Sequence, residues 1–161
     1  MMDGNQTHPQ FPGPAQLRVI ALAMLAAPIL LGGVVVYLRA SGSFGGEGDI
    51  PYFDVGAGGF GVLISVVAFA VRGMIFGGGA GQAPALQAMK YASGVLTFFA
   101  LLEGAMLLNL VVALLVATPW VNVGVIALAF ALAATSLPSE EQRENAGLAP
   151  TPGSGARGLR E

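Results

Sequence analysis

Glu103 is the residue of this chain whose type and position most strongly suggest chemistry. It lies in the run from Leu96 to Val116, in which Thr97 and Asn109 are the only other polar side chains. An ionisable side chain inside a membrane span is costly, so it marks a candidate functional site. A carboxyl group there can bind and release a proton or a sodium ion, or it can hydrogen-bond to a neighbouring helix. Both roles stay open.

Helical geometry separates Glu103 from the nearest amide side chain. Asn109 follows six residues later, about 120° round a helix of 3.6 residues per turn, so the two side chains cannot lie in one stripe. We expect Asn109 to form a hydrogen bond between helices, which is a common role of Asn in membrane spans. Gly104, beside Glu103, should let another helix approach closely.

The second apolar block carries a stripe of small residues that ends in a cation. Its members are three or four positions apart, as on one face of a helix; they are Ala57, Gly61, Ser65, Ala68 and Arg72. Small residues allow close packing in membranes, so we expect another helix there. Arg72 joins Glu103 and Asn109 as a candidate polar residue, but it differs from Glu103 in depth by about 10 Å. We expect its guanidinium to extend to the headgroups.

The rest of the composition excludes several kinds of function. The 161 residues include no Cys and a single His, His8, so the sequence lacks the ligands of thiolate or His-based metal sites. The apolar blocks hold one acid and no His, so we predict no catalytic residue, no metal, no cofactor and no enzyme activity. A net charge of −2 without a basic run argues against a nucleic-acid partner.

Composition and hydropathy identify the class. Hydrophobic residues make up 55% of the chain and charged residues 10%, compared with about 25% charged residues in soluble proteins. The apolar residues form four blocks, each close to the roughly 20 residues that a helix needs to cross a bilayer. We predict an all-α integral membrane protein, a bundle of four transmembrane helices over residues 19–38, 55–76, 92–117 and 120–137.

Polar segments flank this predicted transmembrane domain of residues 17–138. Residues 1–16 and 139–161 are rich in polar residues, Gly and Pro, so we predict a flexible N-terminal tail and a disordered C-terminal tail. Most Lys and Arg residues fall on the side of the termini, and Arg39 falls on the other. Both termini are therefore expected in the cytoplasm, with the protein in an inner or plasma membrane. The first block could instead be a cleaved signal peptide, although its core is longer than the usual 7 to about 15 residues.

One run resembles the third span of a family of small, uncharacterised bacterial four-span membrane proteins. It extends from Ala100 to Leu115 and reads Ala-Leu-Leu-Glu-Gly-Ala-Met-Leu-Leu-Asn-Leu-Val-Val-Ala-Leu-Leu. The resemblance covers residues 89–141 and implies a four-helix architecture in a bacterial inner membrane, with no activity attached. The run is also similar, more distantly, to the carboxylate helix of rotary ATPase proteolipid subunits, which implies ion binding by Glu103. Four-span proteolipids usually carry this carboxylate in the fourth span, whereas here it lies in the third.

Two functions remain open on these grounds. The first is a non-catalytic bundle or a component of a membrane complex, whose partners are the lipid bilayer and either further copies of the chain or other membrane subunits. The second is a proton- or sodium-coupled transporter or proteolipid-like subunit, in which Glu103 is the titrating carboxylate.

Overall fold

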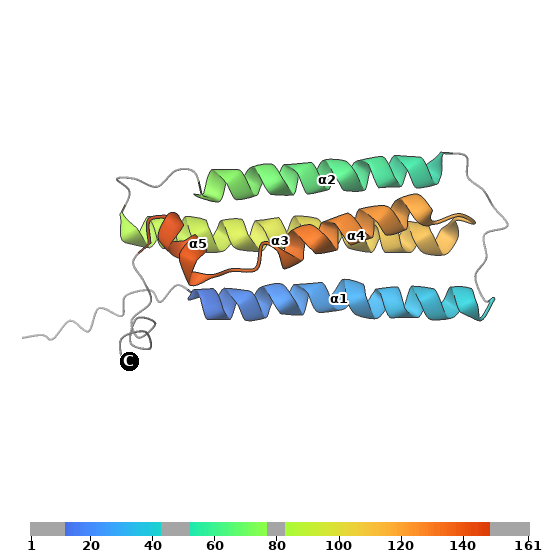
Figure 1. Ribbon diagram of the computed structural model, residues 1–161, viewed down its shortest axis with the longest axis horizontal. Coiled ribbons are helices and arrows are strands. Elements are labelled where there is room, and N and C mark those ends of the chain that lie inside the picture. Colours follow the sequence, from blue (N-terminus) through green and yellow to red (C-terminus); the bar gives the residue numbers. More distant parts are fainter. Residues whose placement is uncertain (1–11, 43–51, 77–82, 149–161) are drawn as a thin grey trace, which may run out of the picture.

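The computed structural model describes residues 12–42, 52–76 and 83–148. Within these ranges the chain forms helices and no strand, which confirms the all-α prediction for them. The helices are α1 (Pro14–Ala40), α2 (Phe53–Phe76), α3 (Pro84–Leu115), α4 (Trp120–Ala134) and α5 (Glu140–Asn145). The four longer helices lie side by side and alternate in direction, so α1 and α3 run one way and α2 and α4 the other (Figure 1).

Three of the described helices are long and apolar enough to cross a membrane. The spans that they offer are Pro14–Ala40, Phe53–Met74 and Ala85–Leu115. α4 is apolar too, but its 15 residues reach only about 22 Å, less than the ~30 Å of hydrocarbon. It ends at Ala134, three residues before the predicted end of the fourth span.

α3 is the central helix of the bundle. It packs against α1, α2 and α4, and α2 and α4 also pack against each other. Phe99, Leu102 and Met106 of α3 are among the largest fully buried side chains. Apolar residues of the other helices complete the same core, for example Leu17 of α1 and Ala129 of α4. α3 therefore holds the other helices together.

The predicted tails are shorter than expected at both ends. α1 begins at Pro14, inside the segment 1–16, and α5 lies inside the segment 139–161. The Ser139 hydroxyl caps α5 by accepting a hydrogen bond from the Gln142 backbone N–H (3.2 Å), and Leu148 is buried in the core cluster. Within the segment predicted to be disordered, residues 139–148 therefore carry one helix cap and one apolar contact with the core. Residues 1–11 and 149–161 of the predicted tails lie outside the described chain.

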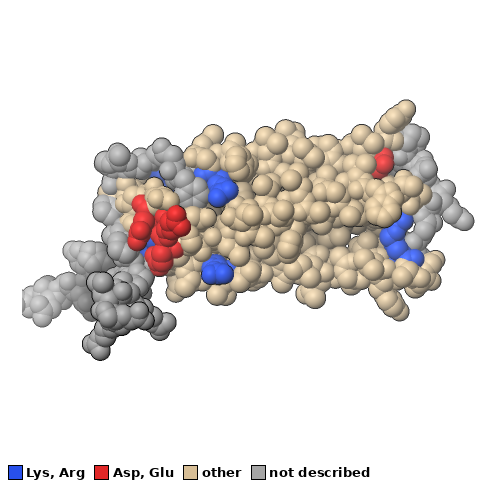
Figure 2. Space-filling model, in the orientation of Figure 1, with Lys and Arg blue, Asp and Glu red and all other residues tan. Residues whose placement is uncertain are grey.

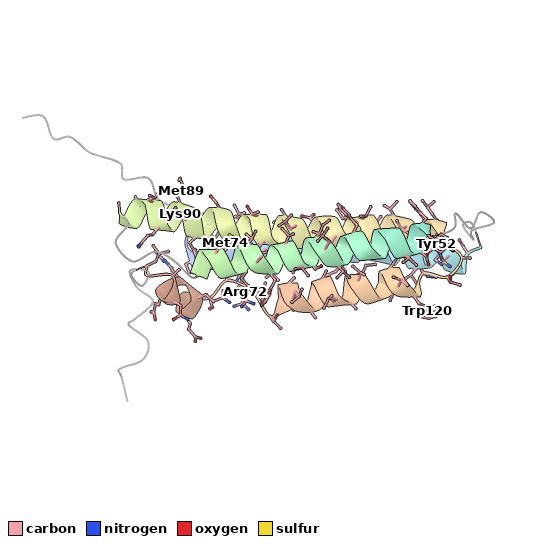
Figure 3. All side chains as sticks on the ribbon, turned by 90° about the horizontal axis from the view of Figure 1, so that it is seen from above. Tyr52, Arg72, Met74, Met89, Lys90 and Trp120 are labelled. Atoms are coloured by element: carbon pink, nitrogen blue, oxygen red, sulfur yellow. The ribbon has the colours of Figure 1, made fainter. Side chains whose placement is uncertain are left out.

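Apart from Glu103, the charged side chains of the described residues lie toward the two ends of the bundle. The middle of the face shown in Figure 2 carries none. Arg72 and Lys90 lie at the end where α1 begins, and Tyr52 and Trp120 lie at the opposite end (Figure 3). We call these the Lys90 end and the Trp120 end. Tyr52 and Trp120 are 83% and 79% exposed, as expected of aromatic rings at a membrane–water interface.

Arg39 joins the ends of two helices at the Trp120 end. The last carbonyl oxygens of α3 have no partner within the helix. The Arg39 guanidinium, on the last turn of α1, donates hydrogen bonds to the carbonyl oxygens of Ala113, Val116 (2.7 Å) and Ala117 (2.9 Å). Its positive charge also lies at the negative end of the α3 dipole. This contact ties α1 to α3.

Replacing Arg39 with Ala should lower the free energy of unfolding by about 1 to 2 kcal/mol, because it removes hydrogen bonds from a charged donor. Thermal unfolding of the purified protein in detergent measures the loss. The matched control is Arg18→Ala, which removes an exposed arginine at the other end of α1 and should change stability by less than about 0.5 kcal/mol. Equal losses in the two variants would contradict a specific role for the Arg39 contact.

Candidate functional site

Glu103 lies at the edge of the outward face of α3. Its side chain is partly exposed. Gly104, the next residue, has no heavy atom within 4 Å of the position that a Cβ would take. Within the part of the chain that the structure describes, the Glu103 side chain takes part in no hydrogen bond or ion pair. The carboxyl group is therefore not enclosed by its own bundle.

Small and hydroxyl-bearing residues surround Glu103 on this outward side. Exposed positions recur every three or four residues along α3, as one face of a helix requires; they are Ser93, Thr97, Ala100, Gly104, Leu108, Val111 and Leu115. The half of this stripe from residue 93 to residue 104 contains no large apolar side chain. By contrast, α2 exposes several large ones, such as Phe60 and Phe69. We call residues 93, 97, 100, 103 and 104 the Glu103 face.

Asn109 is fully buried and lies against α2. Its amide nitrogen donates to the Ala105 carbonyl oxygen of its own helix (2.9 Å), whereas its amide oxygen has no hydrogen-bond partner among the described residues. Gly61 of α2 is the neighbour: a Cβ there would lie 2.7 Å from the Val125 Cγ1 atom, and closer still to the Asn109 nitrogen. The structure thus brings Asn109 and Gly61 together, two residues singled out from the sequence.

The other small residues of the α2 stripe also face the bundle. Ser65 and Ala68 are 2% and 0% exposed, and Ala57 and Arg72 are partly exposed. The Ser65 hydroxyl donates to the Gly61 carbonyl oxygen (2.9 Å), so this buried hydroxyl is satisfied within α2.

Arg72 lies at a different depth from Glu103. Gly61 and Asn109 share one level, and α2 and α3 run in opposite directions. Counting from that level toward the Lys90 end, Arg72 is eleven residues away and Glu103 six, a difference of about 7 to 8 Å. The Arg72 guanidinium carbon lies 5.9 Å from the centre of the Phe69 ring, within range of a cation–π contact. The structure does not bring Arg72 and Glu103 together.

Asn122 is a second buried amide, which we did not predict. It is fully buried in α4, and neither its amide oxygen nor its amide nitrogen has a hydrogen-bond partner in the described chain. It shares the buried face of α4 with Val125, the residue that meets Gly61. The signal that could have revealed it is a polar residue within the fourth apolar block, two positions after Trp120.

α1 has a carbonyl without its helical donor at about the level of Glu103. Pro28 lies inside α1 and has no N–H, so the Met24 carbonyl lacks its usual partner. α1 and α3 run in the same direction, and Gly32 lies beside Leu110. Met24 is eight residues before Gly32 and Glu103 is seven before Leu110, so they share a level to within about one residue's rise.

Neither a cluster of metal ligands among the described residues nor a known relative indicates what this site does. Among residues 12–42, 52–76 and 83–148, no group of three His, Cys, Asp or Glu side chains could hold a metal ion. Comparison of the chain with models of protein families, with curated proteins and with solved structures finds no match. The assignment therefore depends on the geometry around Glu103.

The close contact at Gly61 predicts a sharp difference between two glycines of α2. Gly61→Val should lower the free energy of unfolding by about 1 to 3 kcal/mol, because the added methyl groups overpack the contact with Asn109 and Val125. In Gly59→Val the new Cβ meets nothing within 4 Å, so stability should change by less than about 0.5 kcal/mol. Circular dichroism during thermal unfolding in detergent measures both. Equal tolerance of the two variants would contradict the packing.

Proposed function

We propose that this chain is a non-catalytic four-span membrane protein that works as a component of a membrane complex and joins its partner through the Glu103 face. α1, α2 and α3 each cross the membrane, and α4 with the following residues 135–139 makes the fourth crossing. Both termini lie in the cytoplasm, and the membrane is a cell membrane, of the bacterial inner-membrane type that the sequence resemblance implies.

Hydropathy and charge placement support this location. The described helices offer three apolar spans, and α4, with the connection and α5 that follow it, returns the chain to the Lys90 end (Figure 1). α4 is short, but bilayers thin locally around short spans at modest cost. Its final carbonyl oxygens at Ala131 and Leu132 accept hydrogen bonds from the Thr135 hydroxyl (3.0 and 3.1 Å). The excess of Lys and Arg at the Lys90 end favours the cytoplasm for that end.

The observation that carries the proposal is the position of Glu103. It lies about 18 Å from the Trp120 end of α3, counting twelve residues back from Leu115, and so well inside the hydrocarbon. It is partly exposed there, and no described residue donates a hydrogen bond to it. A carboxyl group without a partner in lipid is expensive even when it is neutral. A hydrogen-bond partner on another chain removes this unfavourable free energy.

The Glu103 face suits a second helix with the same chemistry. Its small residues let a backbone approach closely, and its carboxyl group can hydrogen-bond across the contact. A second copy of the chain offers all of these groups, since a twofold contact pairs one face with itself. Two facing Glu103 side chains then lie at the same depth in the contact.

The exposure of Glu103 also supports the second candidate function, a proton- or sodium-coupled subunit, because a purely structural acid would be enclosed by the bundle. A carboxyl group on the outer surface of a helix can exchange a proton or a sodium ion with an adjoining subunit, as a transporter or proteolipid-like subunit requires. In that case Glu103 must titrate, whereas a contact residue needs only to form hydrogen bonds.

Cross-linking of single cysteines tests the proposed contact. The chain has no Cys, so Ala100→Cys places one thiol on the Glu103 face. Oxidation in native membranes should give a disulfide-linked dimer, and adding Glu103→Leu should lower its yield about fivefold, since an interhelical hydrogen bond in membranes contributes about 1 kcal/mol. The matched control is Ala70→Cys, an exposed alanine of α2, which should stay monomeric.

Several outcomes would count against this proposal. Equal cross-linking through both thiols would contradict a specific contact between copies. A heavier adduct that contains another membrane protein would keep the face as an interface and assign it to another subunit. The ion-coupled candidate would gain if Glu103→Gln, which hydrogen-bonds but cannot titrate, abolished proton or sodium flux in proteoliposomes without lowering stability.

A further inference from the structure

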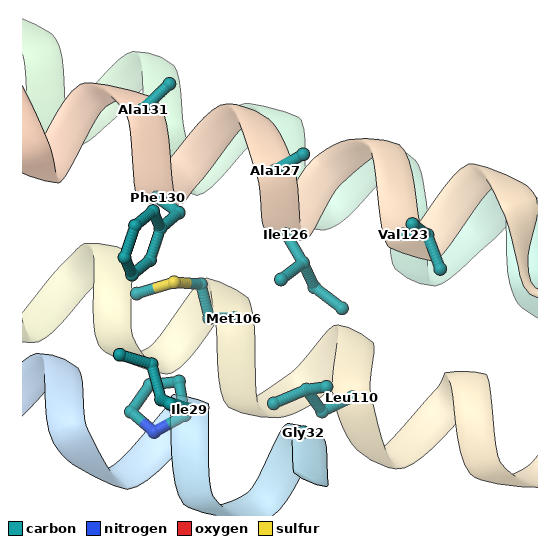
Figure 4. A pocket seen from close by; sticks show the side chains of 10 residues that line it. Ile29, Gly32, Met106, Leu110, Val123, Ile126, Ala127, Phe130 and Ala131 are labelled. Atoms are coloured by element: carbon teal, nitrogen blue, oxygen red, sulfur yellow. The ribbon is translucent and has the colours of Figure 1, made fainter. Parts of the chain in front are cut away.

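An open groove runs along the bundle between α1 and α4, with α3 as its floor (Figure 4). Its volume is about 450 Å³. Pro28 and Gly32 line one wall, Leu110 lies on the floor, and Val123 and Ala131 mark its reach along α4. Nearly all of the lining surface is apolar. The groove faces away from the α2 contact and is separate from Asn109 and Asn122.

The groove is about as long as one leaflet of a bilayer is deep. Val123 and Ala131 are eight residues apart, so they span about 12 Å, compared with about 15 Å for half of the hydrocarbon. Val123 is only three residues from the start of α4 at Trp120. The groove therefore occupies the leaflet at the Trp120 end.

A positive charge and an aromatic ring flank the outer end of the groove. Arg39 is seven residues after Gly32, on the same side of α1 and about 10 Å further along. Its guanidinium bonds to carbonyl groups one to two turns beyond Leu110. These bonds use three of its five N–H groups, which leaves two for a further acceptor. Trp120 is three residues before Val123 on α4.

We infer that this groove binds one acyl chain of a phospholipid whose phosphate is held at Arg39. The inference rests on the membrane location proposed above. An apolar channel one leaflet deep fits an acyl chain, and the Arg39 guanidinium, about 10 Å beyond Gly32 toward the membrane surface, fits the phosphate by charge.

Fluorescence quenching of Trp120 tests the site directly. Trp120 is the single Trp of the chain, and bromine atoms on the upper part of a lipid chain quench a nearby indole. The protein is reconstituted in phosphatidylcholine vesicles with equal small fractions of brominated phosphatidylglycerol or brominated phosphatidylcholine. Quenching should show that brominated phosphatidylglycerol associates about fivefold more strongly than brominated phosphatidylcholine. This factor corresponds to about 1 kcal/mol for one Arg beside an anionic lipid.

Two adjacent glycines provide matched variants. A Cβ on Gly32 would lie 3.6 Å from Leu110 Cδ2, so Gly32→Leu should be accommodated and should fill the groove, whereas a Cβ on Gly33 meets nothing within 4 Å. Gly32→Leu should reduce quenching to the level set by the bulk lipid fraction, and Gly33→Leu should leave it unchanged. Arg39→Gln should remove the preference for the anionic lipid.

The outcomes distinguish a failure of the proposed lipid site from a failure of the proposed membrane location. If the wild-type protein floats with the vesicles but both lipids quench in proportion to their bulk fractions, and Gly32→Leu changes nothing, the groove holds no specific lipid and the inference fails. If the protein does not float with the vesicles, the proposed membrane location fails and the groove inference fails with it.

Discussion

The fold depends on one constraint: inside hydrocarbon, a polar group that finds no hydrogen-bond partner is costly. α3 is the helix on which this constraint acts most strongly, because the other three long helices pack against it. At its Trp120 end, Arg39 of α1 donates hydrogen bonds to the carbonyl groups of Ala113 and of two residues that follow the helix, Val116 and Ala117. Along its buried face Asn109 donates to the Ala105 carbonyl. Along its outward face, Glu103 has no such partner among the described residues.

This contrast separates two kinds of polar residue in the bundle. Asn109 and Asn122 are fully buried where α2, α3 and α4 meet, so they help to define which helices pack together and in which register. Their spare amide groups are enclosed and cannot reach an outside partner. Glu103 lies deeper, about 9 Å further from the Trp120 end than Asn109, and it faces outward beside small residues. An interaction with another chain is therefore assigned to Glu103 rather than to the two amides.

Much of the fold could be predicted from the sequence because hydropathy alone determines which segments can lie in lipid. The first three apolar blocks each became a long helix. The helix ends could not be placed in the same way: α3 begins at Pro84, eight residues before its apolar block, since a helix can continue into the polar interface. α5 was missed although Ser139-Glu-Glu-Gln142 is a local helix-start pattern, because this six-residue polar helix is anchored by the burial of Leu148, which is a tertiary feature.

The candidate site was predicted in part for a similar reason. A carboxylate or an amide in an apolar block is visible in the sequence, so Glu103 and Asn109 could be named, and their 120° separation followed from helix geometry. The direction in which each faces depends on how the helices pack around α3, which periodicity does not give. Asn122 was overlooked because its block was treated as uniformly apolar. Arg39 was counted only as a charge outside the membrane, although its geometry makes it a cap for a neighbouring helix.

The central claim is that the partner of Glu103 belongs to another chain. The most direct measurement is the reaction of Glu103 with a hydrophobic carbodiimide, compared between native membranes and monomer dispersed in detergent, with mass spectrometry of the labelled peptide. We predict labelling in the dispersed monomer and protection in the native membrane. Equal labelling in both would contradict a partner at the Glu103 face. Absence of labelling in both would also contradict it, by showing that the chain itself, for example through the Met24 carbonyl, encloses the carboxyl group.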